Sequence, residues 1–202
     1  SMLTPTGLND KEADALMTRV YDEELFSSLQ LRLNYLLYGR SRLSSAQKAL
    51  TSVVAGLPDT VRTGMVLAGN CDGVDTRDYF DLDKRGELID IIKSAQVDGG
   101  TPLGKAIRAA GDMVPGTGED SLIVVLSDGM DSCYGNPCAE ASRLARIKPG
   151  VRINVVDIGN AGAGGCLAEA TGGKVIVADQ TEDLSQMLAQ AANDLSVPEH
   201  CR

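Results

Sequence analysis

The side chains best suited to binding chemistry fall in three glycine-containing segments, at residues 69–75, 99–103 and 127–133. All three offer carboxylate, hydroxyl or amide oxygens, and the first and third also hold a cysteine. Oxygen donors of this kind can bind a hard divalent cation such as Mg²⁺, or they can hydrogen-bond to a protein partner. These segments therefore define the candidate site.

An acidic run overlaps the first segment. Its members are Asp72, Asp75, Asp78, Asp81 and Asp83. The run lacks the Asp-x-Asp-x-Asp-Gly order and the downstream Glu of a calcium loop, so a calcium site is the less favoured interpretation. We interpret the run as a solvated loop and an edge strand, where charge discourages aggregation through the sheet edge.

Two features of the sequence bear on an enzymatic function. The glycine-rich segment 159–165 follows a predicted strand and precedes Asp179 by about 20 positions, as in dinucleotide-binding turns, but its glycines do not follow the Gly-x-Gly-x-x-Gly spacing. The single histidine, His200, lies in the C-terminal tail, so a Ser-His-Asp or Cys-His arrangement has no base. We expect a non-enzymatic protein and keep a dinucleotide-binding enzyme of Rossmann type as an alternative.

The five cysteines bear on the cellular compartment. They are Cys71, Cys133, Cys138, Cys166 and Cys201. Four of them lie within two positions of Gly, Asn, Asp or Pro in predicted loops, where a buried apolar thiol has no obvious place. No Cys-x2-Cys pair is present, so a zinc site is not expected. Disulfides, and hence a periplasmic, secreted or extracellular protein, are the favoured interpretation; inert thiols in a cytosolic protein are the alternative.

Alternating helical and strand patterns surround these segments. Apolar residues at helical spacing predict helices at 9–26, 42–57, 87–94, 103–113, 137–147, 167–170 and 182–195. Apolar or alternating runs predict strands at 29–37, 61–68, 79–82, 122–126, 152–158 and 174–177. Residues 29–37 also fit helical spacing, but a strand is favoured because a clear helix follows. Pro102 is expected at the first helical position of helix 103–113.

This alternation implies an α/β fold with a mostly parallel sheet covered by helices on both faces, a three-layer doubly wound (Rossmann-like) architecture. In such sheets ligands bind at the carboxyl ends of the strands, where the three segments are expected to meet. We divide the chain into an N-terminal helical extension at 1–28, one domain at 29–197 and a tail at 198–202.

Composition excludes two classes of partner. The 28 acidic residues outnumber the 19 basic ones, which gives a net charge of −9, and no local Lys/Arg cluster is visible. Nucleic acid is therefore not an expected partner. The longest apolar stretches, such as 122–126, are too short to cross a bilayer, so no transmembrane segment is expected.

The order of the motifs resembles the von Willebrand factor A (VWA) domain. A Gly-Gly-Thr-Pro-Leu turn at 99–103 is followed, after a helix, by Ile-Val-Val-Leu-Ser-Asp-Gly at 123–129. The Gly-Asn-Cys-Asp turn at 69–72, the Cys133-x4-Cys138 pair, and Cys166 ahead of Ala-Thr-Gly-Gly at 170–173 are similar to a bacterial, cysteine-containing branch. The resemblance covers about residues 39–195 and implies VWA topology with one antiparallel edge strand.

In that family a metal-ion-dependent adhesion site (MIDAS) holds Mg²⁺ through an Asp-x-Ser-x-Ser loop, a Thr and an Asp. Thr101 and Asp128 match the second and third motifs. Counted back from Arg42, the first motif falls on Asn34, Leu36 and Tyr38, where Asn carries no charge and Leu offers no oxygen. The resemblance therefore implies a degenerate site with weak or no Mg²⁺ affinity; magnesium-dependent cell adhesion is the alternative.

The resemblance also implies a protein partner bound by loops at the carboxyl edge of the sheet. If metal is bound, the partner would complete its shell with an acidic side chain. The predicted contact residues are Asn70, Asp72, Asp75, Gly100, Asp131 and Tyr134. The helix at 9–26 is expected to pack on the sheet or to mediate self-association.

Four loop cysteines permit three connectivities. The family's sheet order brings their loops together, and we favour Cys71–Cys133 with Cys138–Cys166 because these bonds would staple the whole rim. A local Cys133–Cys138 bond is the alternative. Cys201 is expected to be free or to pair with another chain.

Overall fold

The computed structural model describes residues 42–97, 99–115, 121–162, 164–178 and 184–193, and the structural statements below concern these residues. The helices are α3 (Arg42–Gly56), α4 (Arg85–Ser94), α5 (Leu103–Met113), α6 (Pro137–Ile147), α7 (Gly165–Thr171) and α8 (Leu184–Ala192). The strands are β1 (Thr63–Leu67), β2 (Asp75–Phe80), β3 (Ser121–Ser127), β4 (Val151–Ile158) and β5 (Val175–Ala178), and a 3-10 turn, η1 (Leu82–Lys84), follows β2. The predicted helix at 9–26, the strand at 29–37 and the tail at 198–202 lie outside the described residues.

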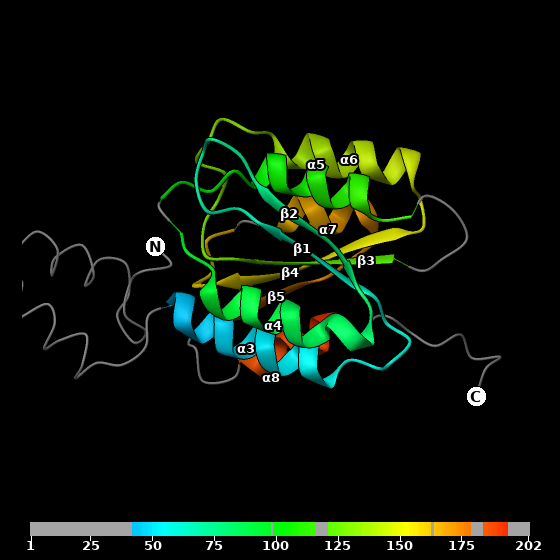
Figure 1. The fold of residues 1–202 in the computed structure, drawn as a ribbon. Helices are drawn as coiled ribbons and strands as arrows, with labels where there is room; N and C mark the ends of the chain where they lie inside the picture. Colours follow the sequence, from blue (N-terminus) through cyan, green and yellow to red (C-terminus); the bar gives the residue numbers. More distant parts are fainter. Residues whose placement is uncertain (1–41, 98, 116–120, 163, 179–183, 194–202) are drawn as a thin grey trace, which may run out of the picture.

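Strands β3, β4 and β5 form a parallel sheet in that order. Seven residues of β3 pair with β4, from Ser121 opposite Val151 to Ser127 opposite Asp157. Alternate residues of β4 serve opposite faces: Val155 packs in a cluster with α5, α6 and α7, whereas Val156 packs in a cluster with α3 and α8. Both side chains are fully buried. Figure 1 shows α5, α6 and α7 on one side of the strands and α3, α4 and α8 on the other, which gives the predicted three layers.

Strands β1 and β2 form a separate antiparallel pair, with Leu67 opposite Asp75 and Thr63 opposite Phe80. The predicted antiparallel strand is thus present, but its predicted bounds of 79–82 are wrong. Pairing with β1 extends β2 back to Asp75, because backbone hydrogen bonding outweighs the low strand propensity of these polar residues. Asp75 and Asp78 are exposed, in keeping with a solvated edge strand.

Most other elements lie within one or two residues of their predicted bounds. Helices α5 and α6 have the predicted ends, while α4 begins at Arg85 instead of residue 87. Pro102 precedes α5 as its N-cap residue and does not take the first helical position. Within the described ranges, no helix is long and apolar enough to span a membrane.

A buried arginine closes the connection between α3 and β1. Arg85 is 6% exposed, and its guanidinium donates hydrogen bonds to the carbonyl oxygens of Leu57 (2.7 Å), Pro58 (2.8 Å) and Val61 (3.1 Å). Carbonyls just past a helix end lack partners within the helix, so a guanidinium with several donors is well suited to satisfy them. This contact ties the segment between α3 and β1 to the start of α4.

Replacing Arg85 with Met should lower the free energy of unfolding by about 2–4 kcal/mol, because three partly buried carbonyls would lose a charged donor. Chemical denaturation monitored by circular dichroism measures this change. Lys84→Met, at the exposed neighbouring position, is the matched control and should change stability by less than about 0.5 kcal/mol. Equal effects of the two substitutions would contradict the role assigned to Arg85.

Candidate functional site

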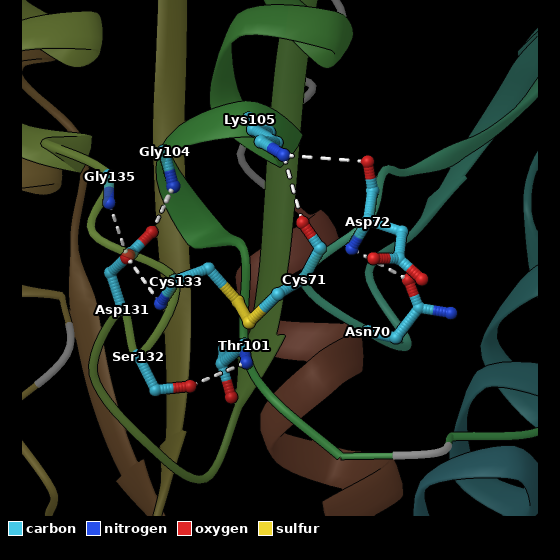
Figure 2. The surroundings of a disulfide bond; sticks show 10 residues. All are labelled: Asn70, Cys71, Asp72, Thr101, Gly104, Lys105, Asp131, Ser132, Cys133 and Gly135. Atoms are coloured by element: carbon cyan, nitrogen blue, oxygen red, sulfur yellow. Dashed lines mark hydrogen bonds between the residues drawn. A yellow bond between two sulfur atoms is a disulfide. The ribbon is translucent and has the colours of Figure 1, made fainter.

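The three segments that the sequence predicted to share one edge of the sheet do meet there (Figure 2). A parallel bridge joins Asn70, just after β1, to Gly99. The backbone N–H of Thr101 donates to Ser132 Oγ (2.7 Å), and the N–H of Ser132 donates to the Thr101 carbonyl (3.1 Å). We call this surface the rim and define it as residues 70–75, 99–101 and 128–134.

Two disulfides cross-link the rim and the helices below it. Cys71–Cys133 joins the loop after β1 to the loop after β3, and Cys138–Cys166 joins the first turn of α6 to α7. The favoured pairing is therefore confirmed. The bonds close loops of 62 and 28 residues, and loop-closure entropy alone predicts roughly 4 kcal/mol of stabilisation from each.

Gly100 lies directly against the Cys71–Cys133 disulfide. It has a φ of 84°, and a Cβ atom at this position would lie 2.6 Å from Cys71 Sγ and 3.2 Å from Cys133 Sγ. Both the backbone conformation and the lack of space therefore require glycine. Gly100 was predicted as a contact residue; the structure places it as the support of the disulfide.

Asp131 organises the loop after β3. Its carboxylate accepts hydrogen bonds from the backbone N–H groups of Gly104 (2.8 Å), Cys133 (3.0 Å) and Gly135 (2.7 Å). Partial burial alone would raise the pKa of Asp131, but these backbone hydrogen bonds outweigh burial and hold the pKa below its ordinary value. Asp131 thus ties its own loop to the start of α5 (Figure 2).

The same loop presents two apolar side chains to solvent. Tyr134 is fully exposed and Met130 is 65% exposed. Tyr134 has a φ of 61°, a left-handed conformation that is rare for an aromatic residue. Its neighbours Cys133 and Gly135 are both hydrogen-bonded to Asp131, and Cys133 is also in a disulfide. These constraints hold the strained backbone in place and keep the ring in solvent.

The loop after β1 is ordered by polar contacts. Asn70 Oδ1 accepts from the N–H of Asp72 (3.0 Å), and Lys105 Nζ, from the first turn of α5, donates to the Cys71 carbonyl (2.9 Å). Asp72 is exposed, and Asp75 forms an exposed ion pair with Arg77 at 2.7 Å. Asn70 therefore shapes the loop, while the carboxylates of Asp72 and Asp75 face solvent.

Comparison with known proteins agrees with this geometry. Residues 31–130 match the family model of the von Willebrand factor type A domain. The chain belongs to the von Willebrand factor A family. Its two disulfides fit the cysteine-containing branch.

Individual relatives of this VWA domain are distant. The uncharacterized protein YwmC of Bacillus subtilis (strain 168) is 24% identical over 177 residues, which cover 78% of this chain and 77% of the relative. The conserved hypothetical protein BatB from Bacteroides thetaiotaomicron is 18% identical with a TM-score of 0.63, covering 77% of this chain and 88% of that chain. Proximal thread matrix protein 1 from the mussel byssus, solved with a zinc-occupied MIDAS motif, is 16% identical with a TM-score of 0.60, covering 76% of this chain and 42% of that chain. At these identities the structural likeness shows a shared fold.

VWA domains can hold a metal ion at a MIDAS motif, whose counterparts in this chain are Thr101, Asp128 and Asn34. Thr101 and Asp128 line the same cavity at the rim, but Asn34 lies outside the described residues. Asp128 is 8% exposed, and its Oδ2, which accepts no hydrogen bond from the described residues, lies 3.7 Å from Arg42 Nη1. In the part of the chain that the structure describes, no three His, Cys, Asp or Glu side chains cluster as metal ligands.

Arg42 makes this arrangement unfavourable for a divalent cation. A divalent cation bound to Asp128 would lie close to this guanidinium, and the two positive charges would repel each other. Mg²⁺ also requires about six oxygen ligands. Thr101 and Asp128, with Arg42 in place, do not provide such a shell.

The glycine-rich loop after β4 is built around a buried acid. Asp157 is 1% exposed, and its carboxylate accepts from the N–H groups of Ala161 (2.9 Å) and Gly162 (2.8 Å). In a dinucleotide site such N–H groups would face the pyrophosphate, and a carboxylate in their midst would repel it. The geometry therefore disfavours the dinucleotide interpretation; Asp179 lies outside the described residues.

Four residues in or beside the rim were not singled out from the sequence. Arg42 and Lys105 are cations that contact rim residues, Ser132 accepts from Thr101, and Met130 is an exposed apolar side chain. Met130 carried no decisive signal, since a single apolar residue at the surface is common. The other three depend on contacts between segments distant in sequence, for which no local pattern exists.

The lowered pKa of Asp131 predicts a defined acid sensitivity. A carboxyl whose pKa is lower in the folded than in the unfolded chain stabilises the fold above its unfolded pKa of about 3.9, and this contribution is lost as the pH falls through the lower, folded value. Asp131→Asn should therefore reduce the melting temperature at pH 7 and flatten its decline below about pH 4. Differential scanning calorimetry from pH 2 to 7, with Asp90→Asn at an exposed position as control, measures both effects. A decline as steep as that of the wild type would contradict this role.

Proposed function

We propose that this VWA domain is a non-enzymatic protein-binding module that contacts its partner through the rim. VWA domains typically mediate protein–protein interaction or adhesion, which supports this class of function. The two disulfides support a periplasmic or extracellular setting, where such bonds persist.

The observation that carries the proposal is the presentation of Tyr134. A fully exposed tyrosine on a strained backbone, fixed on one side by a disulfide and on both sides by Asp131, has no visible role in stabilising the described fold. Tyrosine is enriched among the residues that dominate binding energy, and a rigid loop loses little entropy on binding. Met130 adds a second apolar side chain to the same loop.

The proposed roles within the rim differ. Tyr134 and Met130 are the apolar anchors, and the exposed carboxylate of Asp72 favours a partner surface of positive charge. Asn70, Gly100 and Asp131 contribute by holding the loops in shape. Self-association through residues 1–28 is a separate hypothesis, which light scattering would test.

Truncating Tyr134 should weaken partner binding without unfolding the domain. The immobilised full chain would be incubated with an extracytoplasmic extract of the native host, and captured proteins quantified by mass spectrometry. Tyr134→Ala should reduce capture of the specific partner at least tenfold, since loss of an aromatic anchor costs about 2 kcal/mol or more. Leu82→Ala, which removes a 48% exposed apolar side chain away from the rim, is the matched control. Undiminished capture by Tyr134→Ala at equal thermal stability would refute the proposal.

We further propose that this binding is independent of metal, because Arg42 already accompanies Asp128. Magnesium-dependent adhesion is the competing version. Adding millimolar Mg²⁺ or Mn²⁺ to the full chain should change the melting temperature by less than about 1 °C, since only a ligand that binds the folded state raises it. A larger rise that Asp128→Asn abolishes would establish the metal-dependent version. The same titration with a nicotinamide dinucleotide tests the enzymatic alternative.

A further inference from the structure

Strand β5 ends the parallel sheet, and its outer edge has no strand partner among the described residues. The carbonyl oxygens of Lys174 and Ala178 accept hydrogen bonds from the N–H groups of Val155 (2.8 Å) and Gly159 (2.9 Å), so both carbonyls point toward β4. Backbone groups alternate in direction along a strand. The N–H and C=O groups of the odd-numbered β5 residues, 175 and 177, therefore point away from β4 and toward the outer edge.

The side chains at this edge are apolar and accessible. Val175 is 39% exposed, Val177 is 38% exposed, and β5 holds no charged residue. By contrast β2, which pairs only with β1 among the described strands, carries Asp75, Arg77 and Asp78. Charged side chains commonly keep an edge strand from pairing with another chain. The four residues of β5 lack this protection, so its edge is suited to strand addition.

The helix beside β5 is also uncharged. Ile176 packs in one cluster with Leu188 of α8. The fully buried Asn154 of β4 joins the two elements, because its side chain accepts from the Lys174 N–H (2.8 Å) and donates to the Ala191 carbonyl (2.7 Å). No residue of β5 or α8 is charged, although 23% of the residues in the chain are. Depletion of charged residues is typical of the core of a protein interface.

We propose that β5 pairs with β5 of a second copy of this chain, antiparallel and across a twofold axis, so that two sheets become one. The chain has a net charge of −9, so two copies repel each other where their acidic surfaces approach. An uncharged strand and helix allow close approach without this repulsion. An antiparallel pair of identical strands is also self-complementary, as a twofold interface requires.

The directions of the backbone groups determine the register of this pairing. All outward groups are used when Val175 of each copy lies opposite Val177 of the other, and each such pair exchanges two hydrogen bonds. Ile176 then lies opposite Ile176 of the second copy, on the twofold axis. Opposite residues share a face of the sheet, so valine meets valine and isoleucine meets isoleucine. Such β-branched pairs stabilise a sheet.

The dimer would present its two rims in opposite directions, because the rim lies at the carboxyl ends of the strands and the two sheets run antiparallel. One dimer would thus join two partner molecules, whichever protein the rim binds. A stable interface buries about 1,200–2,000 Å² in total, more than two short strands supply. We therefore expect the two α8 helices, which lie next to β5, to contribute to the interface.

Analytical ultracentrifugation of the full chain, in a Cys201→Ser background that excludes covalent dimers through that residue, tests the proposal. We expect a monomer–dimer equilibrium. Val177→Lys should raise the dissociation constant at least about tenfold, since a charge without an opposite partner destabilises the strand pair. Thr76→Lys adds the same charge at an exposed position of β2 and should leave the dissociation constant unchanged. A chain that stays monomeric even at millimolar concentration would overturn the proposal.

Cross-linking tests the register and does not depend on the Val177 variant. Opposite residues in a non-hydrogen-bonded antiparallel pair have Cα atoms about 4.5 Å apart, within reach of a disulfide. In the same background, Ile176→Cys should form a covalent dimer on mild oxidation, whereas Thr76→Cys should not. A dimer that Val177→Lys leaves intact, or that Ile176→Cys does not cross-link, would place self-association on another surface, such as residues 1–28, and would overturn the proposal.

Discussion

The parallel pairing of β3 with β4 is the constraint on which the rest of the structure depends. Seven residue pairs align the two strands, and the two-sided burial of Val155 and Val156 fixes which face each helix must cover. Once the strands are parallel, the loops that follow them emerge at one edge. The Asn70–Gly99 bridge and the Cys71–Cys133 bond add the loop after β1 to this edge, so the rim combines segments as far apart as residues 70 and 134.

Covalent and hydrogen-bonded contacts then convert neighbouring loops into one surface. The Cys71–Cys133 bond, the Thr101–Ser132 hydrogen bonds and the three N–H groups on Asp131 all bridge different segments. Each contact satisfies polar atoms of one segment with atoms of another. Some rim residues thus hold the loops in shape, while others expose their side chains to solvent. A rigid surface with exposed side chains is consistent with the proposed binding role.

Sequence patterns predicted the elements well wherever local spacing decided the outcome. Helices α5 and α6 and the buried strand β3 follow directly from apolar periodicity. β2 was placed too late because its start depends on pairing with β1, a contact that no local pattern encodes. The same limit applies to the site residues. Thr101 and Asp128 were singled out because they match a family motif. Arg42 and Ser132 contact residues distant along the chain, which no local pattern predicts.

Tyr134 directly follows a disulfide-bonded cysteine, so the conformation of its loop depends on oxidation of that cysteine. Before oxidation, the loop after β3 would be held by hydrogen bonds alone, and the left-handed backbone at Tyr134 would relax to conformations of lower energy. A chain with reduced cysteines would then lack the shaped surface around Tyr134, and oxidation of Cys71 and Cys133 would form it. The redox state of one cysteine pair thus controls the conformation of a side chain that makes no part of the bond itself.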